Sequence, residues 1–225
     1  MREIMTGDGS MTFHSEAYGE SYHSITGAVE EAFKKFVEPT HIAGLADLGM
    51  VSILDVCFGL GYNTAAALDK ILEVNPGCKV VVVGLEKDRE ILSRIPGLSP
   101  QIKNYHVIKE LVKSNKNEDS IINNYEYTDK NVRINLLVCD ALEGVKSIKL
   151  KFDIIFHDPF SPKKNPELWT EDFFRQLRKL IKPDGILTTY SCAGMVRRNL
   201  KAAGFEVKDG PCVGRRSPST VAVPV

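Results

Sequence analysis

Glycine and acidic residues stand at the ends of four predicted strands of this 225-residue chain. Gly59 and Gly61 follow the first strand, where glycine lets a ligand approach the backbone closely. Glu86 ends the second strand, and its carboxylate is placed to accept hydrogen bonds from two ribose hydroxyls. Asp140 follows the third strand and could receive an adenine amino group, and Asp158 follows the fourth. Together these positions predict a site for a nucleoside-type ligand.

The glycine loop distinguishes between two kinds of nucleoside ligand. A helix beginning near Asn63 offers free N–H groups and a positive dipole end, but Thr64 stands where the third glycine of a G-x-G-x-x-G fingerprint would be. The loop also lacks a cationic cradle for a pyrophosphate. A sulfonium such as S-adenosylmethionine needs no phosphate site and fits better. Cys57, Lys87 and Ala141 adjoin the strand-end positions and are further candidate cofactor contacts.

Alternating strand-like and helix-like segments must position these residues. Strands are predicted at 50–58, 78–86, 131–140, 151–158 and 183–191, and helices at 63–75, 141–148, 170–181 and 193–204. Continuous apolar strands separated by helices predict an α/β fold with a doubly wound, mostly parallel sheet. Its ligand crevice should lie at the carboxyl ends of the strands.

Two regions fall outside this pattern. Residues 1–48 are predicted to form a short N-terminal arm that packs on or covers the cofactor site, and residues 49–225 to form one domain. Within that domain the polar, Asn-rich stretch 96–130 is predicted to be a peripheral or mobile insert.

Charge, cysteine and histidine content limit the kinds of partner, cell compartment and metal site that the chain can have. The chain has no net charge, but from residue 146 onward it has 15 Lys and Arg against 8 Asp and Glu. Such a basic half indicates either a polyanionic partner or solvated helix faces. Five cysteines without a C-x-x-C pair favour reduced thiols in a cytoplasmic protein. Scattered histidines argue against a metal site, and no apolar run is long enough to cross a membrane.

Several segments resemble a known family. The arrangement "ILDVCFGLGYNT … VVVVGLEKD … LLVCDALEG … FDIIFHDPF" is similar to the class I methyltransferase fold, which is Rossmann-like and has a seven-stranded sheet. "FEVKDG" and "STVAVPV" would supply the last two strands, one of them reversed. "HDPFSPKKNPELWT", "YSCAGMVRRNLKAAGFEV" and "SEAYGESYHSITGAVEEAFKKFVEP" resemble the methyltransferase domain of the MnmC/MnmD family, from about Ser15 to Gly214.

The resemblance implies an activity. The family methylates the aminomethyl group of modified wobble uridines in tRNA with S-adenosylmethionine, so the chain is expected to be a tRNA (5-aminomethyl-2-thiouridylate) methyltransferase that binds the anticodon arm. The second, flavin-binding domain of fused members has no counterpart in this sequence. A separate oxidoreductase partner would then carry out the oxidative step.

The resemblance also implies roles for individual residues. Asp158 would be catalytic, orienting the amine and accepting its proton, and would also touch the cofactor. Tyr22 would be a lid contact over the cofactor, unless its segment is only a packing arm. Candidate substrate contacts are Phe160, Lys163, Lys164, Trp169, Arg197 and Arg198. The lysines and arginines could meet phosphates or simply be solvated, and Trp169 could stack on an unpaired base or cap the helix at 170–181 against the sheet.

Two other functions share much of this pattern. An aminopropyltransferase of the spermidine-synthase type has the same sheet and an acidic residue at the end of the fourth strand, but Lys163 and Lys164 would repel its polycationic substrate. A non-catalytic nucleoside- or RNA-binding module would have no need of Asp158.

Overall fold

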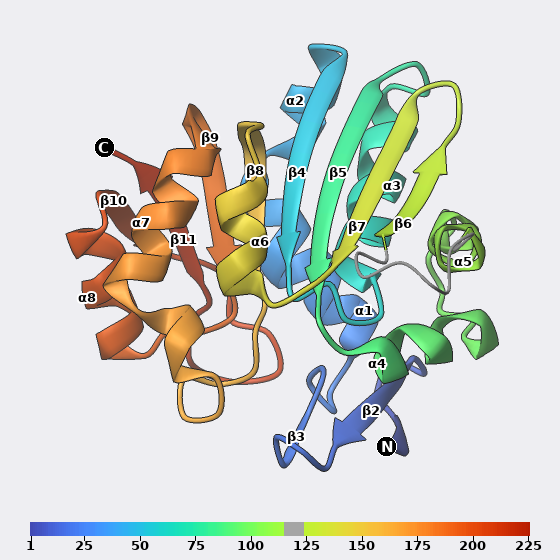
Figure 1. The fold of residues 1–225 in the computed structure, drawn as a ribbon, viewed down its shortest axis with the longest axis horizontal. Helices are drawn as coiled ribbons and strands as arrows, with labels where there is room; N and C mark the ends of the chain where they lie inside the picture. Colours follow the sequence, from blue (N-terminus) through green and yellow to red (C-terminus); the bar gives the residue numbers. More distant parts are fainter. Residues whose placement is uncertain (115–123) are drawn as a thin grey trace.

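A large twisted sheet forms the centre of the protein (Figure 1), seen in a computed structural model that describes residues 1–114 and 124–225. Its strands in chain order are β4 (Met50–Val56), β5 (Lys79–Glu86), β6 (Asn124–Thr128), β7 (Val132–Val138), β8 (Phe152–His157), β9 (Ile181–Thr189), β10 (Phe205–Asp209) and β11 (Thr220–Pro224). Their spatial order is β10-β11-β9-β8-β4-β5-β7-β6. β4, β5, β7, β8 and β9 are mutually parallel, whereas β11 is antiparallel to both of its neighbours and β6 is antiparallel to β7.

Helices cover both faces of this sheet, as the apolar strands predict. They are α1 (Ala28–Glu31), the π-helical η1 (Ala32–Val37), η2 (Glu38–Thr40), α2 (Ile42–Asp47), α3 (Tyr62–Val74), α4 (Arg89–Arg94), η3 (Ile95–Gly97), α5 (Tyr105–Lys113), α6 (Ala141–Ser147), η4 (Pro166–Trp169), α7 (Glu171–Leu180) and α8 (Gly194–Ala202). Side chains alternate between the faces with the period of two expected of strands. Ile53 of β4 packs with α3 and η1, and the next residue, Leu54, packs with α7 on the other face.

The sheet has one strand more than the seven predicted. Among the described residues the extra strand is β6, which comes from the region 96–130 and pairs with β7 along the edge of the sheet. The same region supplies α5, where Ile108 and Leu111 are completely buried. The prediction of a peripheral or mobile insert is therefore wrong for α5, whose amphipathic pattern was hidden in a polar composition, whereas β6 does lie at the edge of the sheet. Residues 115–123 of the insert lie outside the described residues.

The first 47 residues contribute a small sheet and a helical layer. The small sheet consists of β1 (Arg2–Met5), β2 (Met11–Ser15) and β3 (Glu20–Ser21), and it lies beyond the carboxyl ends of the central strands (Figure 1). The helical layer packs on the large sheet: Phe36 is fully buried, and its carbonyl accepts a 3.2 Å hydrogen bond from the Thr188 hydroxyl in β9. The domain boundary at residue 48 stays a prediction. Among the described residues, no helix combines the length and the apolar character needed to cross a membrane.

Candidate active site

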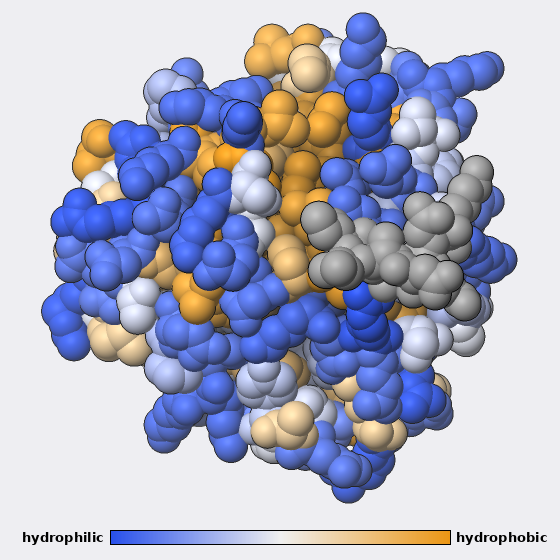
Figure 2. All heavy atoms as spheres, in the orientation of Figure 1, coloured by the Kyte–Doolittle hydropathy of each residue, from blue (hydrophilic) through white to orange (hydrophobic). Residues whose placement is uncertain are grey.

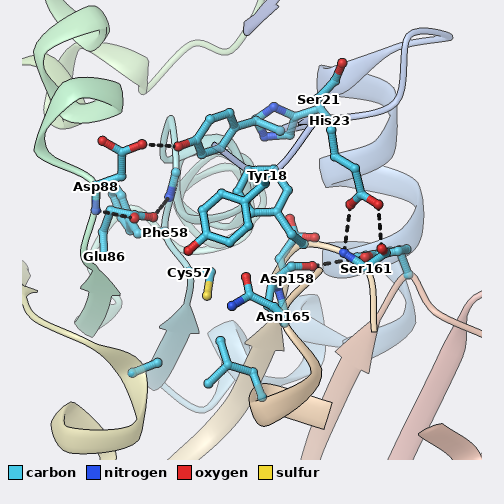
Figure 3. Close-up of a pocket in the computed structure, with 18 of the residues that line it drawn as sticks. Tyr18, Ser21, His23, Cys57, Phe58, Glu86, Asp88, Asp158, Ser161 and Asn165 are labelled. Atoms are coloured by element: carbon cyan, nitrogen blue, oxygen red, sulfur yellow. Dashed lines mark hydrogen bonds between the residues drawn. The ribbon is translucent and has the colours of Figure 1, made fainter. Parts of the chain in front are cut away.

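The carboxyl ends of four parallel strands open into one cavity of about 410 Å³ (Figure 3). Its volume lies within the range of small-molecule sites. Nine of the residues singled out from the sequence line it: Tyr22, Cys57, Gly59, Glu86, Lys87, Asp140, Ala141, Asp158 and Phe160. The residues therefore meet as a parallel sheet requires, although they span well over half of the chain.

Glu86 is fixed on the cavity wall by backbone donors. Its Oε2 accepts the Gly59 N–H at 2.9 Å, and its Oε1 accepts the Asp88 N–H at 2.8 Å. Burial raises the pKa of Glu86, and these hydrogen bonds partly oppose that rise. Each carboxylate oxygen has a second acceptor position. Glu86 can therefore hold the loop after β4 and still accept hydroxyl groups from a ligand.

The loop after β4 is shaped by three residues with positive φ. These are Cys57 (φ 66°), Gly59 (φ 54°) and Gly61 (φ 74°). A Cβ at Gly61 would stand 2.7 Å from Cγ2 of Ile108, so glycine is required there both for its conformation and for space. Gly61 does not line the cavity. Its role is to turn the chain into α3, which corrects its prediction as a cofactor contact.

Three N–H groups of this loop are already used. Those of Phe58 and Gly61 donate to the carbonyls of Leu85 and Phe58, each at 2.9 Å, and that of Gly59 donates to Glu86. A pyrophosphate needs free N–H donors, so the loop suits a ligand without phosphate. Asp140 is likewise fixed, because it caps α6 by accepting the Leu142 N–H at 2.9 Å.

Asp158 lies at the end of β8 beside the first turn of α3. Its Oδ2 accepts a 3.0 Å hydrogen bond from Nδ2 of Asn63. Asn63 thus contacts the site through Asp158 and does not line the cavity itself. Burial raises the pKa of Asp158 well above its ordinary value, and the charge of Glu31 adds to this effect, whereas the charge of Lys35 opposes it. A carboxylate in this environment gains stability from a cation bound next to it.

Residues of the N-terminal arm between Tyr18 and Ser24 line the cavity. The Tyr18 ring stacks on Phe160 with centroids 4.4 Å apart, and the Tyr22 ring meets Phe160 edge to face at 4.9 Å. The Tyr22 hydroxyl donates to Oδ2 of Asp88 at 2.5 Å. Oxygens of Glu20 accept the N–H and the hydroxyl of Ser161 at 3.0 and 2.5 Å (Figure 3).

Two predicted substrate contacts are placed differently from the expectation. Trp169 is fully buried, and its Nε1 donates to the Phe160 carbonyl at 2.9 Å. A buried indole has no free face for a base in this structure, and Trp169 packs in the core cluster that includes Phe173 and Leu177 of α7. Arg197 pairs with Asp209 at 2.6 Å and donates to Thr220 and Ser219, so its guanidinium is occupied in joining α8 to the last two strands.

The remaining basic candidates are exposed. Figure 2 shows that hydrophilic residues cover much of one face of the molecule. Lys163 and Lys164 project from the loop after β8, and Arg198 lies on the open side of α8. Lys87 lies 3.6 Å from Asp140, with its ammonium 5.6 Å from the Tyr18 ring centroid.

Sequence reasoning missed several lining residues. These include Glu31, Lys35 and Tyr190. Glu31 and Lys35 are spaced four apart on a helix, which in a sequence is typical of a surface ion pair. Arg215 donates to the Tyr190 carbonyl beside the cavity, a position that only the folded C-terminal loop reveals.

The lining fits S-adenosylmethionine. Fixed carboxylates are present where ribose, adenine and a sulfonium would need them, at Glu86, Asp140 and Asp158, and the glycine loop offers no phosphate cradle. Among the described residues, no cluster of His, Cys, Asp and Glu has the arrangement of a metal site.

Comparison with known proteins gives the class of this protein. Residues 102–224 match a family described as S-adenosyl-L-methionine-dependent methyltransferase. The protein is therefore a member of the S-adenosylmethionine-dependent methyltransferases, as its doubly wound sheet and its cavity indicate.

The particular family follows from closer similarities. A crystal structure of MnmC2 from Aquifex aeolicus is 36% identical and superposes with a TM-score of 0.83, covering 99% of this chain and 70% of that one. The chain is also 30% identical to the tRNA 5-methylaminomethyl-2-thiouridine biosynthesis bifunctional protein MnmC of Pseudomonas entomophila, over 90% of this chain and 32% of that protein. It thus belongs to the MnmC methyltransferase-domain family.

A third relative has no described activity. The uncharacterized protein MJ0670 of Methanocaldococcus jannaschii is 34% identical over 97% of this chain and 58% of its own length. The chain therefore spans less than two thirds of MJ0670 and about one third of the bifunctional MnmC proteins.

Proposed function

We propose that this chain transfers a methyl group from S-adenosylmethionine to the aminomethyl group of a modified wobble uridine in tRNA. The observation that carries the proposal is the carboxylate of Asp158, held by Asn63 on the wall of the cavity in surroundings that raise its pKa. The name of the bifunctional MnmC relatives, which places them in 5-methylaminomethyl-2-thiouridine biosynthesis, supports this substrate.

The chemistry requires a neutral amine with its lone pair aimed at the methyl carbon. An alkyl amine with a lysine-like pKa is mostly protonated at neutral pH, and making it neutral costs about 4 to 5 kcal/mol. S-adenosylmethionine, when bound, supplies a methyl group activated by a positively charged sulfur. Asp158 accepts a hydrogen bond from the amine and so orients it. Asp158 would then accept the proton that the amine releases once it carries the methyl group.

A raised pKa suits Asp158 to this role. A carboxylate of ordinary pKa is a weak proton acceptor, and proton transfer becomes more favourable as the pKa of the acceptor approaches the working pH. Burial provides this rise, and Asn63 limits it by donating to the ionised form.

The tRNA would approach the loop after β8. Phe160 lies at the cavity, and exposed Lys163 and Lys164 follow it on the outside. Arg198 and the loop that contains Arg215 would extend this basic surface toward phosphates of the anticodon arm. Such an enzyme would work in the cytoplasm, and an oxidoreductase that generates the aminomethyl group would act before it.

The test uses tRNA whose wobble uridines carry aminomethyl groups, with isotope-labelled S-adenosylmethionine and mass spectrometry of the digested nucleosides. Wild-type protein should place one labelled methyl on the amine. Asp158→Asn, which keeps the shape and an acceptor for Asn63, should slow single-turnover transfer by about a hundredfold or more. Asp172→Asn, an exposed acid on α7, is the matched control.

Cofactor binding to each variant must be measured separately. Transfer at near wild-type speed by Asp158→Asn would remove Asp158 from the mechanism. A wild-type protein that binds S-adenosylmethionine but leaves the aminomethyl nucleoside unlabelled would show that the substrate is another molecule.

A further inference from the structure

A buried ion pair lies on the cavity wall, on neither a strand end nor a loop. Glu31 is the last residue of α1, and Lys35 lies in the π-helical turn η1 that continues it. Lys35 Nζ is 2.6 Å from Oε1 of Glu31, and the two side chains are only 4% and 11% exposed. Burying two charges costs free energy that their mutual attraction does not always recover. Such a pair facing a cavity therefore suggests a ligand.

The ammonium of Lys35 has unused hydrogen-bonding capacity. Lysine carries three N–H donors, and among the described residues its hydrogen bond is to Glu31. The second carboxylate oxygen of Glu31 accepts the Ser24 N–H at 2.8 Å. Glu31 is thus held from two sides, whereas Lys35 keeps donors for an anionic group in the cavity. Buried polar groups normally find such partners.

The position of the pair in the cavity limits which part of a ligand it can meet. Phe36, the residue after Lys35, is tied to Thr188 of β9, the strand beside β8. Glu31 and Lys35 both act electrostatically on Asp158 at the end of β8. Glu86 and Asp140 follow β5 and β7, on the other side of β4. The ion pair therefore lies at the end of the cavity away from the carboxylates suited to ribose and adenine.

We propose that Lys35 and Glu31 bind the amino-acid end of S-adenosylmethionine, with Lys35 holding the α-carboxylate and Glu31 facing the α-ammonium. A ligand with its ribose at Glu86 and its sulfonium near Asp158 extends its methionine chain toward this pair. A cation and an anion side by side complement the two charges of a zwitterion. No uncharged group would fit the pair equally well. The inference rests on the use of S-adenosylmethionine by this family and is independent of the tRNA substrate.

The ion pair also distinguishes methyl transfer from aminopropyl transfer. Aminopropyl transfer uses decarboxylated S-adenosylmethionine, which has no carboxylate to meet Lys35. When decarboxylated S-adenosylmethionine is bound, the buried ammonium of Lys35 would have no anionic group to meet, which disfavours binding of that ligand. The pair therefore selects S-adenosylmethionine itself.

The test compares two ligands that differ only in the carboxylate. Lys35→Met removes the ammonium but keeps the length of the side chain, and calorimetric titration then measures the Kd of S-adenosylmethionine and of decarboxylated S-adenosylmethionine without tRNA. We expect S-adenosylmethionine to bind about tenfold to a hundredfold more weakly, the loss typical of a charged hydrogen bond. The Kd of the decarboxylated ligand should change by less than about threefold.

Lys34→Met is the matched control, because Lys34 is the adjacent residue and forms an exposed pair with Glu38 at 3.1 Å. It should leave both Kd values unchanged. If Lys35→Met fails to fold because Glu31 loses its partner, the double variant Glu31→Gln with Lys35→Met removes both charges. It should weaken both ligands, since both carry the ammonium that faces Glu31, but S-adenosylmethionine by about tenfold more than its decarboxylated form.

Two results would overturn the proposal. One is equal weakening of both ligands by a folded Lys35 variant, which would assign the pair a structural role. The other needs only wild-type protein: equal affinity for S-adenosylmethionine and its decarboxylated form would show that the cavity has no carboxylate subsite. Neither result bears on methylation of tRNA, which is measured separately.

Discussion

Asp55 is a completely buried acid in the central strand β4. Thr64 donates a 2.6 Å hydrogen bond to its Oδ2, while Oδ1 has no partner among the described residues. Burial raises the pKa of Asp55 to about 7, and the charge of Glu86 contributes to the rise. Such an acid makes the stability of the protein depend on pH.

The sign of the dependence follows from the raised pKa. Between about pH 4 and pH 7 the folded protein keeps a proton on Asp55 that the unfolded chain has released, so the free energy of unfolding should fall as the pH rises. The loss is about 1.4 kcal/mol for each unit by which the pKa is raised. Asp55→Asn cannot ionise, and its urea-unfolding free energy should fall less over this range.

Asp47→Asn, at an exposed aspartate, serves as the control. Parallel pH profiles for the Asp55 variant and the wild type would show that Asp55 ionises in the folded protein as it does in the unfolded chain.

At the residue scale, the sequence identified strand-end side chains well but not those brought in from helices. Glu86, Asp140 and Asp158 could be placed because parallel strands deliver their ends to one edge. Lys35 could not be found, since an acid and a base four residues apart normally face solvent. The sequence left two roles open for Trp169, because it does not show on which side of a loop an indole lies.

At the scale of elements, the segment 18–24 is held beside the cavity by several contacts, among them the hydrogen bonds from Tyr22 to Asp88 and from the Ser24 N–H to Glu31. Hydrogen bonds from Ser161 to Glu20 join it to the loop after β8, and the rings of Tyr18 and Tyr22 rest against Phe160. Hydrogen bonds to a charged group contribute about 1.5 to 3 kcal/mol. The carboxylate of Glu20 is therefore a substantial part of what keeps the arm closed.

Glu20→Ala should consequently let the arm open more often. Hydrogen exchange of the backbone amides in 18–24, followed by mass spectrometry, should accelerate about tenfold or more in the protein without ligand. Glu16→Ala, at an exposed acid of the same arm, should not change it. Unaltered exchange in the Glu20 variant would mean that the other contacts of the segment, the aromatic ones and the hydrogen bonds to Asp88 and Glu31, suffice to hold the arm.

The strands and helices that were predicted agree with the structure to within about two residues, because their apolar periodicity is strong. The elements of the first 47 residues, α4, α5 and β6 were not predicted. Of these, α5 and β6 lie in a stretch whose average composition is polar. The apolar positions of α5 recur with helical spacing, and only four of its nine residues are buried. Composition over a long window hides such a pattern, whereas its periodicity would have revealed it.

At the scale of the whole molecule, the basic half of the chain is divided between structural and exposed cations. Arg197 is paired inside the fold, but Lys163, Lys164, Arg198 and Arg216 are exposed. The loop after β8 carries the lysines, and Arg216 adjoins Arg215 of the cavity lining. These four exposed residues define the surface expected to meet tRNA phosphates.

Replacing Lys163, Lys164, Arg198 and Arg216 by Ala should weaken tRNA binding and flatten its salt dependence. Removing one cation that meets a phosphate should reduce the slope of log affinity against log salt by roughly 0.7 to 0.9. The affinity for S-adenosylmethionine should stay the same, since that ligand has no phosphate. Fluorescence titrations at several salt concentrations measure both quantities.

The control replaces four exposed lysines that lie outside this surface: Lys79, Lys130, Lys149 and Lys151. Lys79 and Lys151 stand at the amino ends of β5 and β8, at the opposite edge of the sheet. The two quadruple variants lose the same charge. Equal salt slopes for both would show that tRNA binds on another face or responds only to net charge.

The eighth strand has a consequence for how copies of this protein meet each other. Without β6, the apolar strand β7 (VRINLLV) would present unpaired backbone groups along the edge of the sheet, a template for intermolecular strand pairing. β6 covers that edge and turns the exposed Glu126 outward, and at the opposite edge β10 exposes Glu206 and Lys208. Charged outer strands resist edge-to-edge growth, so β6 and β10 should limit aggregation of a central sheet of high apolar content.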